Sequence, residues 1–209
     1  MIFFYFPRLF LTEKGKYMND YLDAIHNLFN NPDLRRKLLL LRWPLLLAFL
    51  ILLLTMIKPE FFWIGLLVSS AGEAIQIWCF ATLKKKKILA AKGPYALVRN
   101  PIYIGRYFLI LGGIMMTGNI WFIIGFSVIY YFYMVNRVKR EEKVLIEIFG
   151  DSYRNYCREI HRFLPSYKNM DNHELFFFKW ELFFKNNAHL NLLAMIICYL
   201  VVYYFLFLF

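Results

Sequence analysis

Residues 92–105 form a polar, turn-rich segment between two apolar runs, and they hold side chains that can bind an anion. Asn100-Pro101 predicts the start of a helix, because proline fits the first helical turn and asparagine can cap it. The free N–H groups and positive dipole end of such a helix attract a carboxylate or a phosphate. Arg99 precedes this start and can bind the same anion through two parallel hydrogen bonds. The segment is therefore a candidate ligand site.

Two tyrosines flank the same helix start. Tyr95 and Tyr103 offer aromatic faces that suit a flat group or a cation. The alternative is an ordinary loop at a membrane surface, where arginine and tyrosine are both common. Both interpretations stand when these residues are considered alone.

A second polar cluster, residues 137–142, follows a later apolar run. Arg137 and Glu141 are four residues apart, so they share one face of a helix. Glu141 and Glu142 are adjacent acids at a hydrophobic boundary, where they can hold a cationic cofactor or position a substrate. The alternative is a solvated charged face with an ordinary ion pair.

The composition places these side chains at a membrane. Of the 209 residues, 60% are hydrophobic and only 19% are charged, whereas soluble domains are about half apolar and about a quarter charged. The net charge of +11 comes from basic residues beside apolar runs. This pattern is typical of cytoplasmic flanks and anionic lipid contact, and it argues against a nucleic-acid partner. The three cysteines and the histidines have no metal-ligand spacing, so we expect no metal.

Five apolar stretches approach the roughly 20 residues that a helix needs to cross a bilayer. They lie at about 38–57, 61–83, 101–116, 120–135 and 190–209. The short connector Thr117-Gly118-Asn119 makes the third and fourth stretches an antiparallel hairpin. The predicted fold class is therefore all-α: a polytopic helical membrane protein with about five transmembrane helices, a helical hairpin, and a cytoplasmic helical segment at 137–165.

The positions of lysine and arginine predict the orientation. Basic residues precede the first stretch and follow the second and the fourth, whereas the connectors on the other side are nearly uncharged. With five crossings, the N-terminus is cytoplasmic and the C-terminus lies outside. We expect an interfacial or cytoplasmic segment at 1–37, a membrane core at 38–165, and at 166–209 an aromatic-rich interfacial helix followed by the last span.

An acidic residue, Glu73, lies within the second apolar stretch. An acid at membrane depth is costly and often functional. The alternative is a buried carboxyl group that is hydrogen-bonded to a neighbouring helix, with Gln76 or Ser70 as partners. The small residues at 69–72 favour close helix packing at this point.

The two polar clusters belong to one ordered pattern over residues 92–165, about a third of the chain. The pattern consists of Gly93-Pro94-Tyr95, Val98-Arg99-Asn100-Pro101-Ile102-Tyr103-Ile104-Gly105, Arg140-Glu141-Glu142, Leu145, Phe149-Gly150, Tyr153, Tyr156 and Arg162-Phe163-Leu164-Pro165. It resembles the isoprenylcysteine carboxyl methyltransferase family, and the related phospholipid N-methyltransferases share much of it.

This resemblance implies an integral membrane enzyme that binds S-adenosylmethionine between the hairpin and the following cytoplasmic helix, while a lipophilic acceptor enters from the bilayer. It implies catalytic roles for Arg137 and Glu142, on the substrate side. It also implies these cofactor-binding residues: Tyr95, Arg99, Asn100, Pro101, Tyr103, Gly105 and Glu141. One position departs, since Asn100 stands where the family usually has histidine. Asparagine can hydrogen-bond but cannot titrate near neutral pH, which weakens assignment to the prenylcysteine branch.

The expected function is S-adenosylmethionine-dependent methyl transfer to a lipophilic acceptor, most like prenylcysteine carboxyl methylation. A carboxylate acceptor needs Arg137 to orient it, whereas an amine or phenol needs a proton acceptor such as Glu142. The alternatives are N-, O- or S-methylation of a phospholipid or another hydrophobic small molecule. From a different class, the chain could be a non-catalytic membrane scaffold or a transporter. Transport calls for polar residues near the midplane, and only Glu73 and Gln76 qualify.

Overall fold

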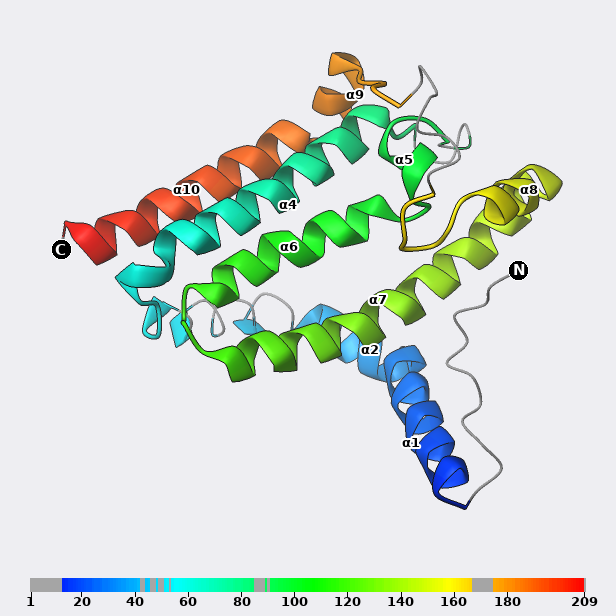
Figure 1. Ribbon diagram of the computed structural model, residues 1–209, viewed down its shortest axis with the longest axis horizontal. Coiled ribbons are helices and arrows are strands. Elements are labelled where there is room, and N and C mark those ends of the chain that lie inside the picture. The colour runs from blue at the N-terminus through cyan, green and yellow to red at the C-terminus, as the bar shows by residue number, and fades with distance from the viewer. Residues whose placement is uncertain are drawn as a thin grey trace.

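The computed structural model describes residues 13–41, 54–84, 91–166 and 175–208, together with residues 44, 45, 48, 51, 52 and 89. Every regular element among these residues is a helix (Figure 1). The helices are α1 (Glu13–Asn30), α2 (Pro32–Leu40), the 3-10 turn η1 (Pro59–Phe61), α4 (Phe62–Thr82), α5 (Pro94–Leu97), α6 (Pro101–Met115), α7 (Ile120–Phe149), α8 (Asp151–Glu159), α9 (Trp180–Lys185) and α10 (Ala188–Phe207).

Three helical segments are long and apolar enough to cross a membrane: Pro59–Thr82, Ile120–Phe149 and Ala188–Phe207. The prediction of an all-α membrane protein is therefore confirmed, and these segments coincide with three of the five expected spans. The 15 residues of α6 rise only about 22 Å, less than the roughly 30 Å of a hydrocarbon core. The expected span at 38–57 lies partly outside the described residues.

Helices α4 and α6 pack closely because small residues line their contact. Gly72 of α4 faces Gly105 of α6, and a Cβ atom on either would lie within 3 Å of the other helix's backbone. Further along, Gly65 faces Gly112 in the same way. The hydroxyl of Ser69 donates a hydrogen bond to the Leu109 carbonyl at 2.7 Å. Small residues let two backbones approach in lipid, so the expected close packing at residues 69–72 is confirmed.

This contact predicts that Gly72→Ala destabilises the protein. The added Cβ would lie 2.6 Å from the Gly105 oxygen, and such overpacking costs about 1–3 kcal/mol. We expect a lower apparent Tm for the detergent-solubilised variant. Gly113→Ala is the matched control on α6, because nothing lies within 4 Å of its added Cβ and alanine is the better helix former. Equal Tm values for the two variants would contradict the close contact.

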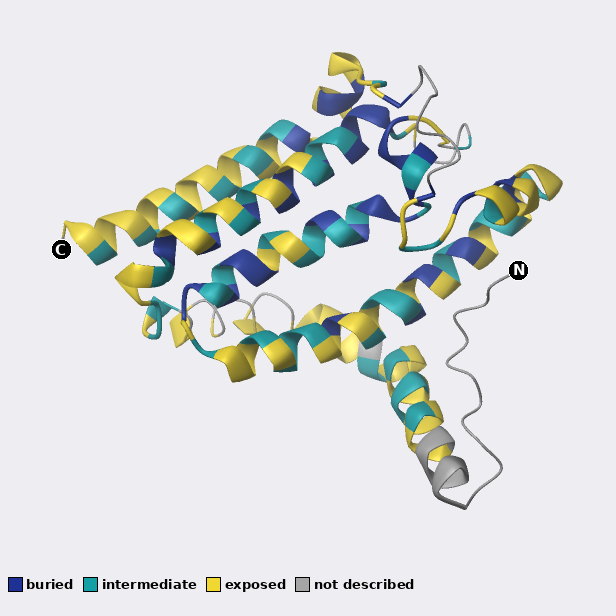
Figure 2. Cartoon of the chain, in the orientation of Figure 1, coloured by how far each residue is buried: buried dark blue, intermediate teal, exposed yellow. Residues whose placement is uncertain are grey.

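Helix α10 lies antiparallel along α4, and the two are side by side in Figure 1. The Tyr199 hydroxyl of α10 donates a hydrogen bond to the Ser69 hydroxyl of α4. At the start of α4 and the end of α10, the rings of Phe62 and Phe207 meet edge to face at 5.6 Å. Much of α10 is exposed and drawn yellow in Figure 2, and most of its exposed side chains are apolar. This exposure suits a helix that faces lipid.

The hairpin of α6 and α7 turns where the sequence predicts it. Gly118 has φ +63°, and a side-chain oxygen of Asn119 accepts a hydrogen bond from the Trp121 N–H at 2.9 Å. The 30 residues of α7 span about 45 Å, longer than a hydrocarbon core. Its second half therefore carries Arg137 and the acidic pair beyond the apolar part of the helix.

Helix α1 packs against α7 at this same level, a contact that the sequence did not predict. Asn136 is nearly fully buried, and its side chain hydrogen-bonds to His26 and Asn30 of α1. The His26 ring also meets Phe132 edge to face. These contacts attach the N-terminal segment to the polar end of the hairpin.

The membrane acid Glu73 is 1% exposed and accepts a hydrogen bond from Gln76 at 3.3 Å. Gln76 is thus the partner of Glu73, as the interpretation of a hydrogen-bonded carboxyl group expects. The two residues belong to the same helix, α4, and not to neighbouring helices. The second carboxylate oxygen of Glu73 has no hydrogen-bond donor among the described residues.

Candidate functional site

A tight turn brings the chain from α4 back to the start of α6. Gly93 has φ +58°, which favours glycine, and a Cβ there would lie 2.7 Å from the Thr82 hydroxyl. Pro94 then begins α5, a single turn that buries Tyr95. The Tyr95 carbonyl accepts a hydrogen bond from the Tyr156 hydroxyl of α8 at 2.6 Å. The turn and α8 therefore fix the entry to the polar segment.

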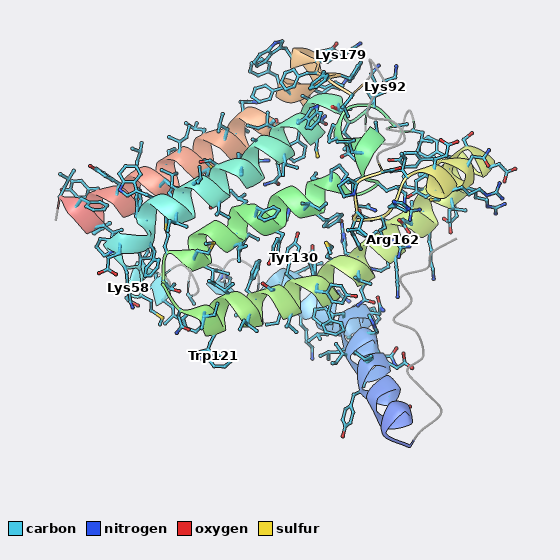
Figure 3. The ribbon with its side chains drawn as sticks, in the orientation of Figure 1. Lys58, Lys92, Trp121, Tyr130, Arg162 and Lys179 are labelled. Carbon is cyan, nitrogen blue, oxygen red and sulfur yellow. The ribbon has the colours of Figure 1, made fainter. Side chains whose placement is uncertain are left out.

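The chain after α8 folds back onto the same segment. The Arg99 N–H donates to the His161 carbonyl at 2.9 Å, and the Ser166 N–H donates to the Leu97 carbonyl at 2.8 Å. The Ser166 hydroxyl also donates to the Glu159 carbonyl. These bonds place residues 160–166 against the start of α6, and they bring Arg162 toward α7 (Figure 3).

Three charged side chains meet where these elements converge. Glu142 of α7 accepts hydrogen bonds from Nε and Nη2 of Arg162, with Nε 3.1 Å from each carboxylate oxygen. The Arg99 guanidinium lies 3.7 Å from the same carboxylate. Asn100 Nδ2 lies 3.5 Å from Glu142 Oε1 and from the Arg162 carbonyl. We call Arg99, Glu142 and Arg162 the arginine–glutamate cluster.

The cluster carries more positive than negative charge, with two guanidiniums and one carboxylate. Its Arg99 and Glu142 side chains are only 12% and 9% exposed. The Arg99 Nε–H is buried and has no hydrogen-bond acceptor among the described residues. An unpaired buried donor is costly, so a bound anion at this point would stabilise the cluster.

The start of α6 adds to the same positive potential. Asn100 occupies the N-cap position, but its side chain makes no capping hydrogen bond. This corrects the expected side-chain cap: the Asn100 amide is turned toward Glu142 instead. The first N–H groups of α6 therefore lack a side-chain acceptor, which is the arrangement that favours an anion at a helix start.

A second group lies one helical turn before Glu142 and is more exposed. Arg137 Nε donates to Glu141 Oε1 at 2.8 Å, with the two side chains 44% and 42% exposed. Arg137 Nε also lies 3.4 Å from the Tyr103 hydroxyl of α6. Tyr103 is itself buried, and its carbonyl accepts from the Tyr130 hydroxyl at 2.7 Å. We call Arg137, Glu141 and Tyr103 the Arg137 triad.

Tyr153 and Tyr156 of α8 lie near the cluster, and Tyr95 is packed in the core beside Tyr156. Burial raises the pKa of Tyr95 well above its usual value, with Cys79 and Tyr156 adding to the effect. Burial likewise raises the pKa of Tyr153 and Tyr156, each with a coulombic contribution from Glu142. These hydroxyls therefore stay protonated near pH 7.

Most of the residues that the sequence selected come together at this end of the bundle. Arg99, Asn100 and Glu142 meet in the cluster, and Arg137, Glu141 and Tyr103 meet in the triad. Pro101 occupies the first turn of α6 as expected. Two residues point elsewhere: Tyr95 is packed in the core, and Gly105 faces Gly72 and Gln76 of α4.

Arg162 is the residue whose role the sequence did not predict. It binds Glu142 more closely than Arg99 does. Burial lowers the pKa of Arg162, but the hydrogen bonds and charge of Glu142 outweigh this and raise it above its ordinary value. The signal available in the sequence was its place in the Arg162-Phe163-Leu164-Pro165 element of the family pattern.

Two arginines share the Glu142 carboxylate, so we expect removal of its charge to destabilise the protein. Glu142→Gln leaves both guanidiniums uncompensated, and breaking a buried pair costs about 3–5 kcal/mol. We expect the free energy of unfolding to fall by about 2–3 kcal/mol, because Arg162 is 34% exposed and solvent screens the pair. The measurement is apparent Tm in detergent. Asp151→Asn, which breaks the exposed pair with Arg154, should change Tm little. A Glu142→Gln protein as stable as Asp151→Asn would contradict the account.

Comparison with known proteins identifies the matching region. The phospholipid methyltransferase family matches residues 61–152. A protein-S-isoprenylcysteine O-methyltransferase from Schizosaccharomyces pombe is 32% identical over 95 residues, covering 46% of this chain and 40% of that protein. The Xenopus laevis protein of the same name is 27% identical over 82 residues, covering 39% and 28%. A methanethiol S-methyltransferase from Pseudomonas deceptionensis is 36% identical over 73 residues, covering 34% and 26%.

These matches span less than half of each relative's length, and no solved structure matches the chain significantly. The apolar helices and the relatives together define the class as a helical integral membrane protein. Within this class, residues 61–152 match the phospholipid methyltransferase family, and part of the chain is similar to protein-S-isoprenylcysteine O-methyltransferases.

Proposed function

We propose that the protein transfers a methyl group from S-adenosylmethionine to a lipophilic acceptor, most like prenylcysteine carboxyl methylation. The observation that carries the proposal is the buried Arg99 Nε–H, which has no acceptor among the described residues and lies beside the uncapped start of α6. A cofactor with a free carboxylate supplies the anion that this donor needs. The relatives are named as methyltransferases, which supports the same reaction class.

The residues present fit the cofactor in charge. Arg99 and the first N–H groups of α6 would hold its carboxylate, with Asn100 and Pro101 shaping that helix start. Glu141 and the face of Tyr103 would favour its cationic sulfonium end. Tyr95 and Gly105 would support this arrangement from behind, through packing. When bound, S-adenosylmethionine supplies an already activated methyl group, so the protein's task is alignment and exclusion of water.

Arg137 and Glu142 would serve the acceptor side in different ways. Arg137 is part-exposed on α7 and can orient a carboxylate acceptor by hydrogen bonding. Glu142 is enclosed by Arg99 and Arg162. A carboxylate whose oxygens are already engaged is a weak proton acceptor, so Glu142 would act by positioning the two arginines.

The same proposal includes the orientation of the chain. We place the arginine–glutamate cluster and the N-terminus on the cytoplasmic side and the C-terminus outside, because the basic residues flank that end of the helices. The division into a segment at 1–37, a membrane core at 38–165 and a C-terminal unit at 166–209 belongs to this proposal.

A second candidate is S-methylation of a small hydrophobic thiol. It is favoured by the 36% identity to a methanethiol S-methyltransferase and by Asn100, which cannot act as a titrating group near neutral pH. N- or O-methylation of a lipid follows as a further alternative. A scaffold or a transporter would not need the unpaired donor at Arg99.

The experiment uses purified protein, S-adenosylmethionine labelled in its methyl group, and three acceptors: a farnesylated cysteine analogue, phosphatidylethanolamine and an alkyl thiol. We expect labelled prenylcysteine whose label is released as methanol by mild alkali, because a methyl ester hydrolyses and a thioether or methylamine does not. Alkali-stable label on the thiol or on the phospholipid would favour the respective alternative. No label on any acceptor or in a membrane lipid extract would contradict the proposal.

A further inference from the structure

A cavity of about 410 Å³ lies beyond the end of α4, and it shares no lining residue with the arginine–glutamate cluster. Its charged lining consists of Lys84, Lys179, Lys185 and Glu181. Lys84 follows the last turn of α4, and the other three come from α9 and the residue before it. Figure 3 shows Lys179 at this end of the molecule, near Lys92.

Hydrogen bonds hold α9 against the end of α4 on one side of the cavity. The Asn186 side chain donates to the carbonyls of Phe80 and Leu83, both at 2.8 Å. The Lys179 N–H donates to the Ala81 carbonyl at 3.0 Å. Neutral donors therefore already satisfy these carbonyls at the end of α4, so capping the helix does not require the lysine ammonium groups.

The charge in the cavity is unbalanced. Three lysines and one glutamate give a formal charge of 3 − 1 = +2. Among the described residues, Glu181 forms no ion pair with any of these lysines, and the Lys179 ammonium lies 5.5 Å from the centre of the Phe177 ring. Three exposed lysines that line one cavity, with no ion pair to a carboxylate among the described residues, favour an anionic ligand.

The surroundings of the cavity suit a lipid. Helix α9 exposes the apolar side chains of Trp180 and Phe184, and aromatic residues of this kind gather at membrane interfaces. Helix α10 begins next to the cavity, and most of its apolar side chains are exposed. The cavity thus joins cationic side chains to a hydrophobic flank, which matches a headgroup phosphate with its acyl chains.

We propose that this cavity binds the phosphate of an anionic phospholipid, with Lys84, Lys179 and Lys185 as its cationic ligands and α10 as the flank for the acyl chains. The site is separate from methyl transfer, so it stands or falls independently of the proposed function.

The test is native mass spectrometry of the full detergent-solubilised chain, titrated with phosphatidylglycerol or phosphatidylcholine of the same acyl chains. We expect preferential retention of phosphatidylglycerol. We also expect Lys84→Gln/Lys179→Gln/Lys185→Gln to weaken that binding by about 100-fold, from roughly fivefold per lysine near an anionic lipid. The matched control is Lys139→Gln/Lys143→Gln/Arg158→Gln, which removes three exposed charges from α7 and α8 and should leave binding within about twofold.

Equal retention of the two lipids, or an equal loss in the control variant, would overturn the proposal. Inorganic phosphate that displaces the lipid at an equal concentration would also overturn it, because the ligand would then be a free anion. If the triple variant does not fold, the double variant Lys84→Gln/Lys185→Gln carries the same expectation with a smaller loss.

Discussion

Arg99→Ala should weaken binding of S-adenosylmethionine by at least about 100-fold. The substitution removes the buried Nε–H and its guanidinium charge, and hydrogen bonds to charged groups contribute about 1.5–3 kcal/mol each. Two such bonds to a carboxylate correspond to a loss of this size. Calorimetric titration of the purified variant with the cofactor gives the dissociation constant directly.

The structure allows the variant to fold. Glu142 keeps its closer partner Arg162, and the hydrogen bond from residue 99 to His161 uses a backbone N–H that alanine retains. Arg154→Ala is the matched control, because Arg154 is exposed and pairs only with Asp151 among the described residues. Unchanged affinity in a folded Arg99→Ala protein would refute the assignment of Arg99 to the cofactor carboxylate.

Arg137→Ala should lower kcat by about 100- to 1,000-fold while cofactor affinity stays within about threefold, as removal of one positioned donor typically does. In the Arg137 triad, the Arg137 and Glu141 side chains are more exposed than those of Arg99 and Glu142. We therefore expect an acceptor to reach the Arg137 guanidinium from outside the packed interior. Steady-state kinetics with the acceptor, combined with the same cofactor titration, separate the two effects.

Two further variants sharpen this second result. Lys139→Ala removes an exposed charge from the same helix, and it should leave kcat unchanged. Arg137→Lys keeps the charge but loses the planar donor fork, so it should recover only part of the activity. An Arg137→Ala protein that loses cofactor affinity as strongly as Arg99→Ala would disprove the division of roles between the two arginines.

Local chemistry predicted the parts of the fold that depend on neighbouring residues. Asn100-Pro101 marks the start of α6, and Thr117-Gly118-Asn119 turns the hairpin of α6 and α7. Each depends on backbone preferences that the residue type fixes. Apolar length likewise predicted α4, α7 and α10 as spans.

Side-chain partners were less predictable because they come from distant parts of the chain. Glu142 and Arg162 are 20 residues apart and meet only because residues 160–166 fold back onto Leu97 and Arg99. The Asn100 side-chain amide lies against Glu142 and does not cap α6, the helix that it precedes. The spacing of Arg137 and Glu141 predicted their pairing, since four residues along one helix suffice.

The contact between α1 and α7 shows the same limit. Asn136 lies 110 residues from His26, and neither residue type signals a partner at that separation. By contrast, the small residues at 69–72 of α4 indicated a close contact, although not which helix would supply it.

The central claim is that the arginine–glutamate cluster and the start of α6 form a site for S-adenosylmethionine. Calorimetric titration of the purified full chain with S-adenosylmethionine and with its demethylated product tests it most directly. We predict saturable one-to-one binding of both compounds, lost in Arg99→Ala and kept in Arg137→Ala. The absence of binding by the wild-type chain at millimolar cofactor would contradict the claim.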